Sequence, residues 1–385
     1  MRGVSILGPP FSRERSIEEM ELFGFVVVLT DQCNFDCAYC YEPKGKKCLE
    51  FSTLVKAVNF FHKFFAPECS INFYGGEPLL AFDTLRRAVE YLECLSAARN
   101  KKIRYSLTTN GSLLNEDILG FLDEHGFSLT LSFDGLAQDF QRKKGTFDFL
   151  TSVIPQVLAR PRISFETNSV FSSETIGYLS ESVQCIVKLG VRKLYVNLAH
   201  KPPWTASSLI RLKKEVADVG DYFLSHYENL TDIPWPSLYE TRERSVCQCL
   251  PGLKQMAVSA QGTLWGCVFF PHYFADKQGT AEYRKYCFGD VDSFIKDPQR
   301  IYAQKIASYS NFQMDRFITP DRSCLICGEI EECWVCPLAA ALSTGEIGRI
   351  PAWSCRAAKL IRKEKRFLMD RFKKRLQHAG ERSSD

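Results

Sequence analysis

The sequence predicts an α/β protein in which residues 23–235 form an open, partial (βα)6 barrel, followed by a small cysteine-rich domain and a C-terminal helix. Six short β-rich runs alternate with helical patterns in the first part. Strand–helix units in series require parallel strands joined by right-handed crossovers. Because six units are too few for a closed barrel of eight, we expect a partial barrel, with a doubly wound sheet as the alternative.

The first run, Phe23–Thr30, is continuously apolar, as expected for a strand covered on both faces. The other predicted strands are Ser70–Tyr74, Ile103–Thr108, Ser128–Phe133, Ile163–Val170 and Lys193–Leu198. In Phe51–Phe65, apolar side chains recur with helical periodicity and share one face. The other predicted helices of this part are Phe82–Arg99, Asn115–His125, Phe147–Arg160 and Ser173–Leu189.

The alternation ends at two proline-containing stretches, Lys201–Pro203 and Pro234–Pro236. Residues 240–355 are rich in Cys, Gly and aromatics with few long periodic runs, which predicts a small fold held by bound metal. Arg356–His378 returns to a basic helical pattern, which we expect to pack on the protein; a membrane surface or an acidic partner is the alternative. The predicted units are an N-terminal extension (1–22), the core (23–235), the cysteine-rich domain (240–355) and the C-terminal helix and tail (356–385).

Composition limits the function. The hydrophobic content of 45% is typical of a soluble globular protein, and a net charge of +4 is too small to indicate a nucleic-acid partner. The sequence has no apolar stretch of about 18 residues and no signal-peptide core at its start, so we expect a cytoplasmic protein without a membrane span. Disulfides are rare in that compartment, so clusters among the sixteen cysteines indicate bound metal.

The first cysteine cluster, Cys33, Cys37 and Cys40, directly follows the first predicted strand. Three thiolates can hold one face of a four-iron cluster, whereas four would saturate it, so one iron stays open for another ligand. Zinc is the alternative, but zinc sites normally use four ligands and no histidine lies nearby.

The spacing Cys-x3-Cys-x-Tyr-Cys after a strand resembles the signature of radical S-adenosylmethionine (SAM) enzymes, with Tyr39 at the aromatic position beside the third cysteine. The resemblance implies a radical SAM barrel and a catalytic [4Fe-4S] cluster whose open iron is chelated by SAM. It also implies reductive cleavage of SAM to a 5′-deoxyadenosyl radical, which abstracts hydrogen from the substrate.

Further motifs fall at the carboxyl ends of the predicted strands, where parallel α/β sheets gather their sites. Gly75, Gly76 and Glu77 end the second strand: the glycines permit close backbone approach to a ligand, and the carboxylate can accept hydrogen bonds from an ammonium group. A plain turn is the alternative, but "GGEP" resembles the segment that holds the amino group of SAM. The resemblance also assigns SAM contacts to Ser132, on the fourth strand, and to Arg142. Two asparagines on the next strands, Asn168 and Asn197, are weaker candidates for lining the cavity.

A second set of cysteines lies toward the C-terminus, and it is too dense for chance. Its members are Cys247, Cys249, Cys267, Cys324, Cys327, Cys333, Cys336 and Cys355. Eight thiolates suffice for two four-iron clusters. The arrangement resembles the SPASM domain, which implies one or two auxiliary [4Fe-4S] clusters, and a structural zinc domain is the alternative. In the outer cluster the resemblance places Cys324, Cys327, Cys333 and Cys355, and in the inner one Cys267 and Cys336 with Cys249 and Cys247.

The resemblance favours an enzyme that modifies a peptide or protein side chain, such as a peptide maturase that forms thioether or carbon–carbon crosslinks. Anaerobic sulfatase maturases are a related possibility, although they carry an Asp used as a base where Val268 follows Cys267. Two further possibilities are a radical SAM enzyme for a small molecule and an iron–sulfur electron carrier without SAM chemistry. The expected partners are a peptide or protein substrate, an electron donor such as flavodoxin or ferredoxin, and a leader-peptide-binding protein.

Overall fold

The computed structural model describes residues 16–201, 204–239, 251–310, 318–320, 323–333 and 335–382. Its centre is an eight-stranded sheet in the order β6-β5-β4-β3-β2-β1-β7-β8. The first six strands are parallel and lie side by side in chain order. Their bounds are β1 Leu22–Thr30, β2 Phe65–Gly75, β3 Lys102–Thr109, β4 Ser128–Ser132, β5 Ser164–Phe171 and β6 Leu194–Leu198.

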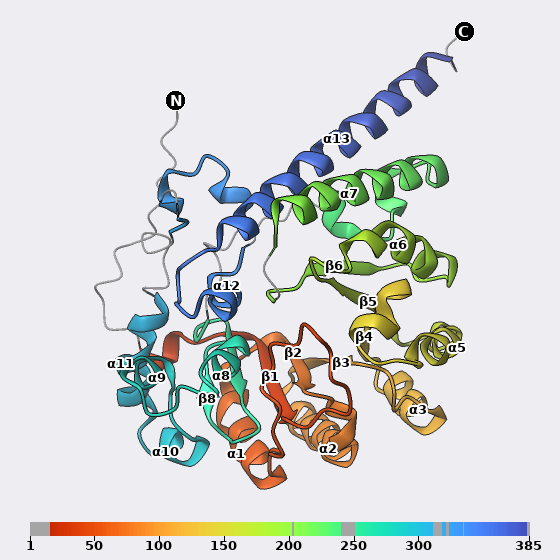
Figure 1. Cartoon of the computed structure of the whole chain (residues 1–385). Coiled ribbons are helices and arrows are strands. Elements are labelled where there is room, and N and C mark those ends of the chain that lie inside the picture. Colours follow the sequence, from red (N-terminus) through yellow and green to blue (C-terminus); the bar gives the residue numbers. More distant parts are fainter. Residues whose placement is uncertain are drawn as a thin grey trace.

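Helices follow the strands and cover the outer side of the curved sheet (Figure 1). They are α1 Phe51–Phe61, α2 Phe82–Arg99, α3 Glu116–Glu124, the short α4 Gln138–Gln141, α5 Thr146–Leu158, α6 Leu179–Lys188 and α7 Ala206–His226. Every crossover therefore steps in one direction along the sheet, whereas a doubly wound sheet reverses at a switch point. The predicted partial (βα)6 barrel is confirmed.

The sequence patterns located these elements closely because apolar side chains of one face pack into one core. Phe25 of β1, for example, is fully buried, with its ring 5.4 Å from that of Phe61 on α1 and 5.9 Å from that of Phe65 on β2. The sequence analysis assigned no helix to α7. It also missed that β2 begins at Phe65, because α1 ends at Phe61 and a 3-10 turn, His62–Phe64, leads directly into the strand.

The sheet continues into the cysteine-rich segment. β7 (Gln255–Val258) pairs in parallel with β1, and β8 (Leu264–Trp265) pairs antiparallel with β7. Five helices follow: α8 Phe269–Tyr273, α9 Ala281–Tyr286, α10 Val291–Lys296, α11 Pro298–Ser310 and α12 Pro337–Thr344. The unit predicted for 240–355 is thus joined to the barrel by backbone hydrogen bonds, and its predicted boundaries stay a prediction.

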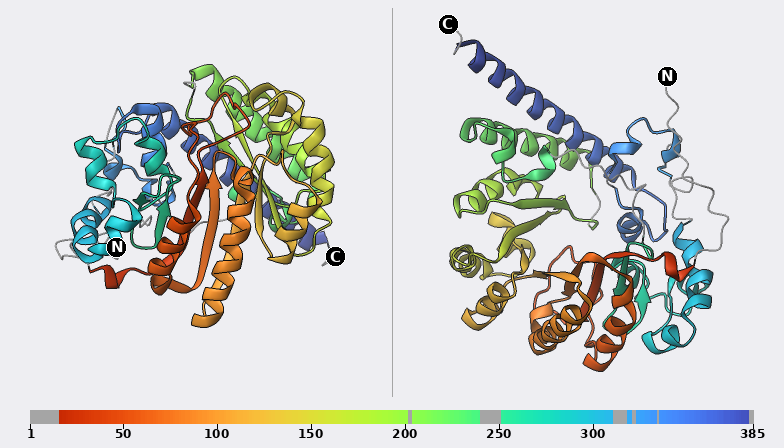
Figure 2. Two further views of the ribbon diagram at one scale, coloured as in Figure 1. Left: turned by 90° about the horizontal axis from the view of Figure 1, so that it is seen from below. Right: turned by 180° about the vertical axis from the view of Figure 1, so that it is seen from behind.

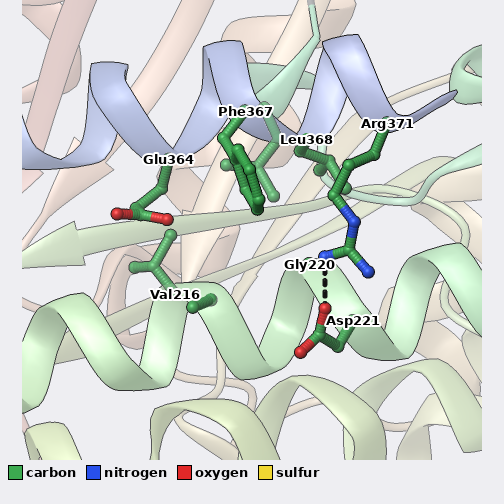
Figure 3. A pocket seen from close by; sticks show the side chains of 9 residues that line it. Val216, Gly220, Asp221, Glu364, Phe367, Leu368 and Arg371 are labelled. Carbon is green, nitrogen blue, oxygen red and sulfur yellow. Dashed lines mark hydrogen bonds and ion pairs between the residues drawn. The ribbon is translucent and has the colours of Figure 1, made fainter. Parts of the chain in front are cut away.

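The last helix, α13 (Ala352–Arg382), runs along α7 and diverges from it toward the C-terminal end (Figure 2). Leu368 and Phe367 face α7 over a shallow pocket, where Arg371 forms an ion pair with Asp221 (Figure 3). Arg375 donates hydrogen bonds to backbone carbonyls at the end of α7, among them that of Leu224 at 2.6 Å. The expected packing helix is therefore observed. In the part of the chain that the structure describes, none of the helices has the length and apolar character needed to cross a bilayer.

Candidate functional site

The loop that carries the first three cysteines leaves the carboxyl end of β1. Cys33 and Cys37 are partly buried and Cys40 is exposed. Burial raises the pKa of all three thiols, and that of Cys40 reaches about 11 because the charges of Glu42 and of the other two cysteines add to the effect of burial. The three side chains therefore share one electrostatic environment. The backbone N–H of Phe35 donates to the Cys33 sulfur at 3.4 Å, a contact that favours the thiolate.

An iron–sulfur cluster fits this donor set better than one ion. Across the described ranges, no three His, Cys, Asp or Glu side chains gather closely enough to hold a single metal ion. A four-iron cluster binds each thiolate at a different iron and so spaces its ligands more widely.

The glycines of the Gly-Gly-Glu-Pro segment bring β2 against the cysteine loop. The N–H of Gly76 donates to the carbonyl of Thr30 at 3.0 Å, and the N–H of Glu77 donates to that of Gln32 at 2.8 Å. A Cβ atom on Gly76 would lie 2.4 Å from the Gln32 carbonyl oxygen and 3.0 Å from the Cβ of Cys33. Gly75, at φ +142°, would place a Cβ 2.3 Å from the Thr30 oxygen. The close approach predicted for a ligand is thus made to the cysteine loop itself.

The side chain of Glu77 is held by hydrogen bonds within the barrel. The residue is fully buried, and its carboxylate accepts hydrogen bonds from the hydroxyl of Thr109 (2.7 Å) and the backbone N–H groups of Asn110 (2.7 Å) and Leu79 (3.1 Å). Burial raises the pKa of Glu77 to about 7, against the lowering effect of these bonds. The side chain thus links the ends of β2 and β3, and its predicted contact with an ammonium group stays a prediction.

A second network holds the loop from the side of β4. Asp134, just beyond β4, is fully buried and forms a two-point ion pair with Arg142, with nitrogen–oxygen distances of 2.7 and 2.9 Å. The same carboxylate accepts the hydroxyl of the buried Tyr39 at 2.9 Å, and the guanidinium lies 5.3 Å from the Tyr39 ring centre. Burial raises the pKa of Cys37 overall, and the positive charge of Arg142 opposes that rise. Through these contacts Arg142 supports the cysteine loop, and its predicted SAM contact stays a prediction.

The network extends to residues that sequence reasoning missed. The side-chain amide of Gln141 donates to Asp134 at 2.7 Å and accepts from the hydroxyl of Thr175 at 2.7 Å. The backbone carbonyl of Gln141 accepts the backbone N–H of Ala38 at 2.8 Å. The sequence offers one indication of this network, an Asp at the end of a strand (Asp134) with an Arg eight residues later (Arg142).

The remaining barrel candidates lie on neighbouring strands. Ser132 of β4 pairs in register with Asn168 of β5, and the side-chain amide of Asn197 on β6 donates to that of Asn168 at 2.7 Å. Ser132 and Asn168 are partly buried and Asn197 is exposed. Their predicted roles stay predictions.

Four of the C-terminal cysteines surround one pocket. Cys324, Cys327, Cys333 and Cys355 all line it, together with Ile330, Lys359, Arg362 and other side chains. These are the four residues that the sequence analysis assigned to the outer cluster. Cys247 and Cys249 lie outside the described residues.

The other two cysteines precede two packed helices. Cys267 lies just before α8, and Cys336 caps the start of α12, where its sulfur accepts the N–H of Ala339 at 3.5 Å. The hydroxyl of Tyr273, the last residue of α8, donates to the carbonyl of Gly345, the C-cap of α12, at 2.7 Å. Because α8 and α12 pack together with their carboxyl ends adjacent, both cysteines lie at the amino-terminal side of this pair. Burial raises the pKa of Cys336, and hydrogen bonds from the backbone N–H groups of Ala339 and Leu338 oppose that rise.

Comparison with known proteins agrees with this geometry. Residues 27–154 match the model of the radical SAM superfamily. The radical SAM cyclopropyl synthase TigE of Paramaledivibacter caminithermalis is 23% identical over 317 residues, 74% of this chain and 66% of that protein. A cysteine-type anaerobic sulfatase-maturating enzyme of Clostridium novyi is 26% identical over 180 residues, 43% of this chain and 48% of its own length. An uncharacterized protein of Methanocaldococcus jannaschii is 31% identical over 180 residues, 45% of this chain and 61% of that protein.

The chain thus spans about half to two thirds of the length of these curated relatives. Among solved structures, native anSMEcpe with bound AdoMet matches 91% of this chain and 99% of its own, with a TM-score of 0.71 at 17% identity. SuiB of Streptococcus suis bound to S-adenosylmethionine matches 87% of this chain and 77% of its own, with a TM-score of 0.56 at 16% identity. Residues 27–154 therefore match the radical SAM superfamily, and the chain shares its fold with anSMEcpe and SuiB.

Proposed function

We propose that this protein is a radical SAM enzyme that abstracts hydrogen from a side chain of a peptide or protein. The observation that carries the proposal is the loop of three clustered thiols at the carboxyl edge of a matched radical SAM barrel. Cys33, Cys37 and Cys40 would hold a [4Fe-4S] cluster that binds SAM. When bound, the cluster supplies the electron that cleaves SAM reductively.

The chain's own residues would hold this site in a fixed geometry. Hydrogen bonds from Gly76 and Glu77 fix the start of the cysteine loop on β2, and the ion pair of Asp134 with Arg142 supports its centre through Tyr39. A preorganised loop needs no rearrangement when the cofactor binds, which is the usual basis of precise radical placement. Ser132 and the asparagines of β5 and β6 are the proposed contacts further inside the barrel.

The C-terminal cysteines would hold auxiliary clusters. We assign the outer cluster to the four cysteines of one pocket, Cys324, Cys327, Cys333 and Cys355. The inner cluster would use Cys267 and Cys336, with Cys249 and Cys247 as further candidates. Lys359 and Arg362 beside the outer pocket would favour its negatively charged thiolates and an electron donor such as flavodoxin or ferredoxin. A cytoplasmic location and a leader-peptide-binding partner remain predictions.

The relatives support a peptide substrate and leave two candidate reactions. Crosslinking or cyclisation is supported by the similarity to TigE, a cyclopropyl synthase, and to SuiB, which has been solved with its precursor peptide SuiA. Oxidation of a sulfatase side chain is the second candidate, supported by the sulfatase-maturating relatives and by the match to anSMEcpe. Val268, at the N-cap of α8, carries no carboxylate, which favours the first candidate.

Anaerobic reconstitution tests the proposal. The protein should bind about twelve iron atoms if three clusters form, and reduced protein should convert SAM to 5′-deoxyadenosine. Replacing Cys33, Cys37 and Cys40 with Ala should abolish 5′-deoxyadenosine while the auxiliary iron remains. Cys94→Ala, at an exposed cysteine of α2, is the matched control and should keep full activity. Cleavage of SAM by the triple variant would contradict the assignment, and about four iron with bound zinc would contradict the auxiliary clusters.

A further inference from the structure

The two edges of the sheet end differently. At one edge, β8 is bonded on its outer side: the N–H of Leu264 donates to the carbonyl of Gly289 at 2.8 Å, and the N–H of Phe288 donates to that of Leu264 at 3.0 Å. The other edge is β6 (Leu194–Leu198), which pairs with β5 on one side and ends the sheet (Figure 1). The outer side of an edge strand offers its N–H and C=O groups to another strand.

Alternate residues of β6 direct their backbone groups toward β5 and away from it. The N–H of Thr167, on β5, donates to the carbonyl of Lys193 at 3.1 Å, so the odd-numbered positions face β5. The N–H and C=O groups of Leu194, Val196 and Leu198 therefore point outward. These three residues form the row that a further strand would meet.

In the part of the chain that the structure describes, this row is bonded at its start alone. The N–H of Leu194 donates to the carbonyl of Pro234 at 2.7 Å, whereas the outward groups of Val196 and Leu198 make no hydrogen bond there. Both residues are partly exposed, and Asn197 between them is exposed. The strand also lacks the charge, proline or bulge with which proteins usually protect an edge. Two donors and two acceptors thus remain available in one row.

The row ends near the cysteine loop. Two residues beyond β6, the ring of His200 lies 6.3 Å from that of Tyr41, which directly follows the third cysteine. On the face of β6 opposite the buried Leu194, the amide of Asn197 donates to that of Asn168 at 2.7 Å. A chain laid along β6 would therefore have one end at the cysteine loop, with alternate side chains beside these amides.

An extended peptide is the occupant that suits this edge. Peptides that add a strand to an open sheet edge bind through main-chain hydrogen bonds, and two unbonded residues in one row supply these. The edge offers no charge to an ionic ligand, because the lysine just before it, Lys193, is paired with Glu166 at 2.8 Å. The edge therefore favours recognition of a peptide backbone.

We propose that the outer edge of β6 binds an extended segment of the substrate as an added strand, and so carries the reacting residue to the radical SAM site. The proposal rests on the proposed function, because it assigns the binding mode of the peptide on which that site would act. It gives Val196 and Leu198 a role in substrate binding through their main-chain groups, so substrates with different side chains can bind alike.

Amide hydrogen exchange of the reconstituted, SAM-bound protein tests the edge, with single residues resolved by electron-transfer fragmentation. The probe is the N-acetylated, C-amidated peptide Thr-Val-Ser-Val-Thr, which favours extended structure, at about 1 mM. Exchange of the Val196 and Leu198 amides should slow at least about fivefold, because a paired amide exchanges only when the pair opens. The same peptide N-methylated at every backbone nitrogen keeps the side chains, but it lacks the donors and crowds the edge. It should leave the exchange unchanged.

Two variants separate the backbone from the side chain. Val196→Pro removes the outward N–H and places a ring against the edge without removing a bond to β5, so the peptide should no longer slow the exchange of Leu198. Val196→Thr keeps the N–H and the branched shape, and should retain the effect. The N-methylated peptide makes the same comparison on the wild type, so the test holds even if Val196→Pro disturbs packing.

Three results would each overturn the proposal. The first is no slowing by the unmodified peptide, and the second is an equal slowing by the N-methylated one. The third is slow exchange of Val196 and Leu198 before any peptide is added, because another segment of the chain would then occupy the edge. A wild type that fails to form 5′-deoxyadenosine would instead overturn the proposed function.

Discussion

The two cysteine sites of this molecule are held in different ways. The loop of Cys33, Cys37 and Cys40 is bonded to distant parts of the barrel: to β2 through Gly76, and to α4 through the N–H of Ala38. Around the outer pocket, the N–H of Cys327 donates to the carbonyl of Cys324 at 3.0 Å and that of Cys333 to Ile330 at 3.1 Å, and fewer bonds reach distant segments, such as that of Ile350 to Ile318 at 2.8 Å.

The side chains show the same contrast. Asp134 and Tyr39, beneath the first loop, are buried, whereas Ile326 between two outer cysteines is 74% exposed. The outer segment is tied to α13 by surface ion pairs, such as Arg366 with Glu332, which contribute little to stability. The difference teaches that the barrel shapes its cysteine loop in advance, and we expect the outer segment to depend more on the cluster proposed to bind there.

Removal of iron should separate the two regions most strongly. Chelation under reducing conditions should raise amide hydrogen exchange in residues 323–333 on the order of 100-fold, because the bound cluster supplies most of the ordering free energy there. The strands β1–β5 should keep their protection. Mass spectrometry after timed exchange measures both regions in one sample. Equal loss of protection in the strands would show that the barrel also needs its cluster.

Breaking the buried ion pair tests the preformed loop. Arg142→Met leaves the Asp134 carboxylate buried with one charge partner fewer, and should lower the free energy of unfolding by about 3–5 kcal/mol. Tyr39→Phe removes only one hydrogen bond and should cost about 1 kcal/mol. Urea unfolding of the protein measures both values. If Arg142→Met unfolds like wild type, the network does not support the loop.

The glycine contact gives a smaller and more local effect. Gly76→Ala brings a methyl group into the Gln32 carbonyl and the Cβ of Cys33, and should cost about 1–3 kcal/mol through displacement of the loop. The amount of iron bound by Cys33, Cys37 and Cys40 should also fall in this variant. The part of the absorption spectrum that changes when SAM is added measures it. Gly120→Ala is the control, since nothing lies within 4 Å of its added methyl group. Unchanged iron content in Gly76→Ala would contradict the proposed close contact.

The pH dependence of stability should depend on Glu77. Burial raises the pKa of Glu77 from 4.5 to about 7, so between these values the folded protein holds a proton that the unfolded chain releases. Stability from this group is therefore full below pH 4.5 and is lost as the pH rises through 7. The thermal midpoint of wild type should fall by ~2 °C from this group between about pH 5 and pH 8, and Glu77→Gln should lack that component. A Glu77→Gln protein with the same pH profile as wild type would show that Glu77 titrates normally.

The sequence by itself determined the barrel and the location of the cysteine sites. Apolar periodicity located the strand Ser128–Ser132 and the helix Phe82–Arg99 because such patterns repeat over neighbouring residues and report burial directly. The cysteine spacing predicts that Cys324, Cys327, Cys333 and Cys355 form one site. In the structure all four line one pocket.

The tertiary structure alone decided what surrounds these sites. The hydrogen bond of Tyr39 to Asp134 spans 95 positions of the chain, and the ring of Tyr41 packs near both His200, after β6, and His272 on α8. β7 could not be predicted, because four residues carry too little periodicity until β1 offers an edge for pairing. Contacts between side chains far apart in the sequence leave no local pattern, so only the folded chain shows that Gly76 serves the cysteine loop and that Glu77 is already bonded.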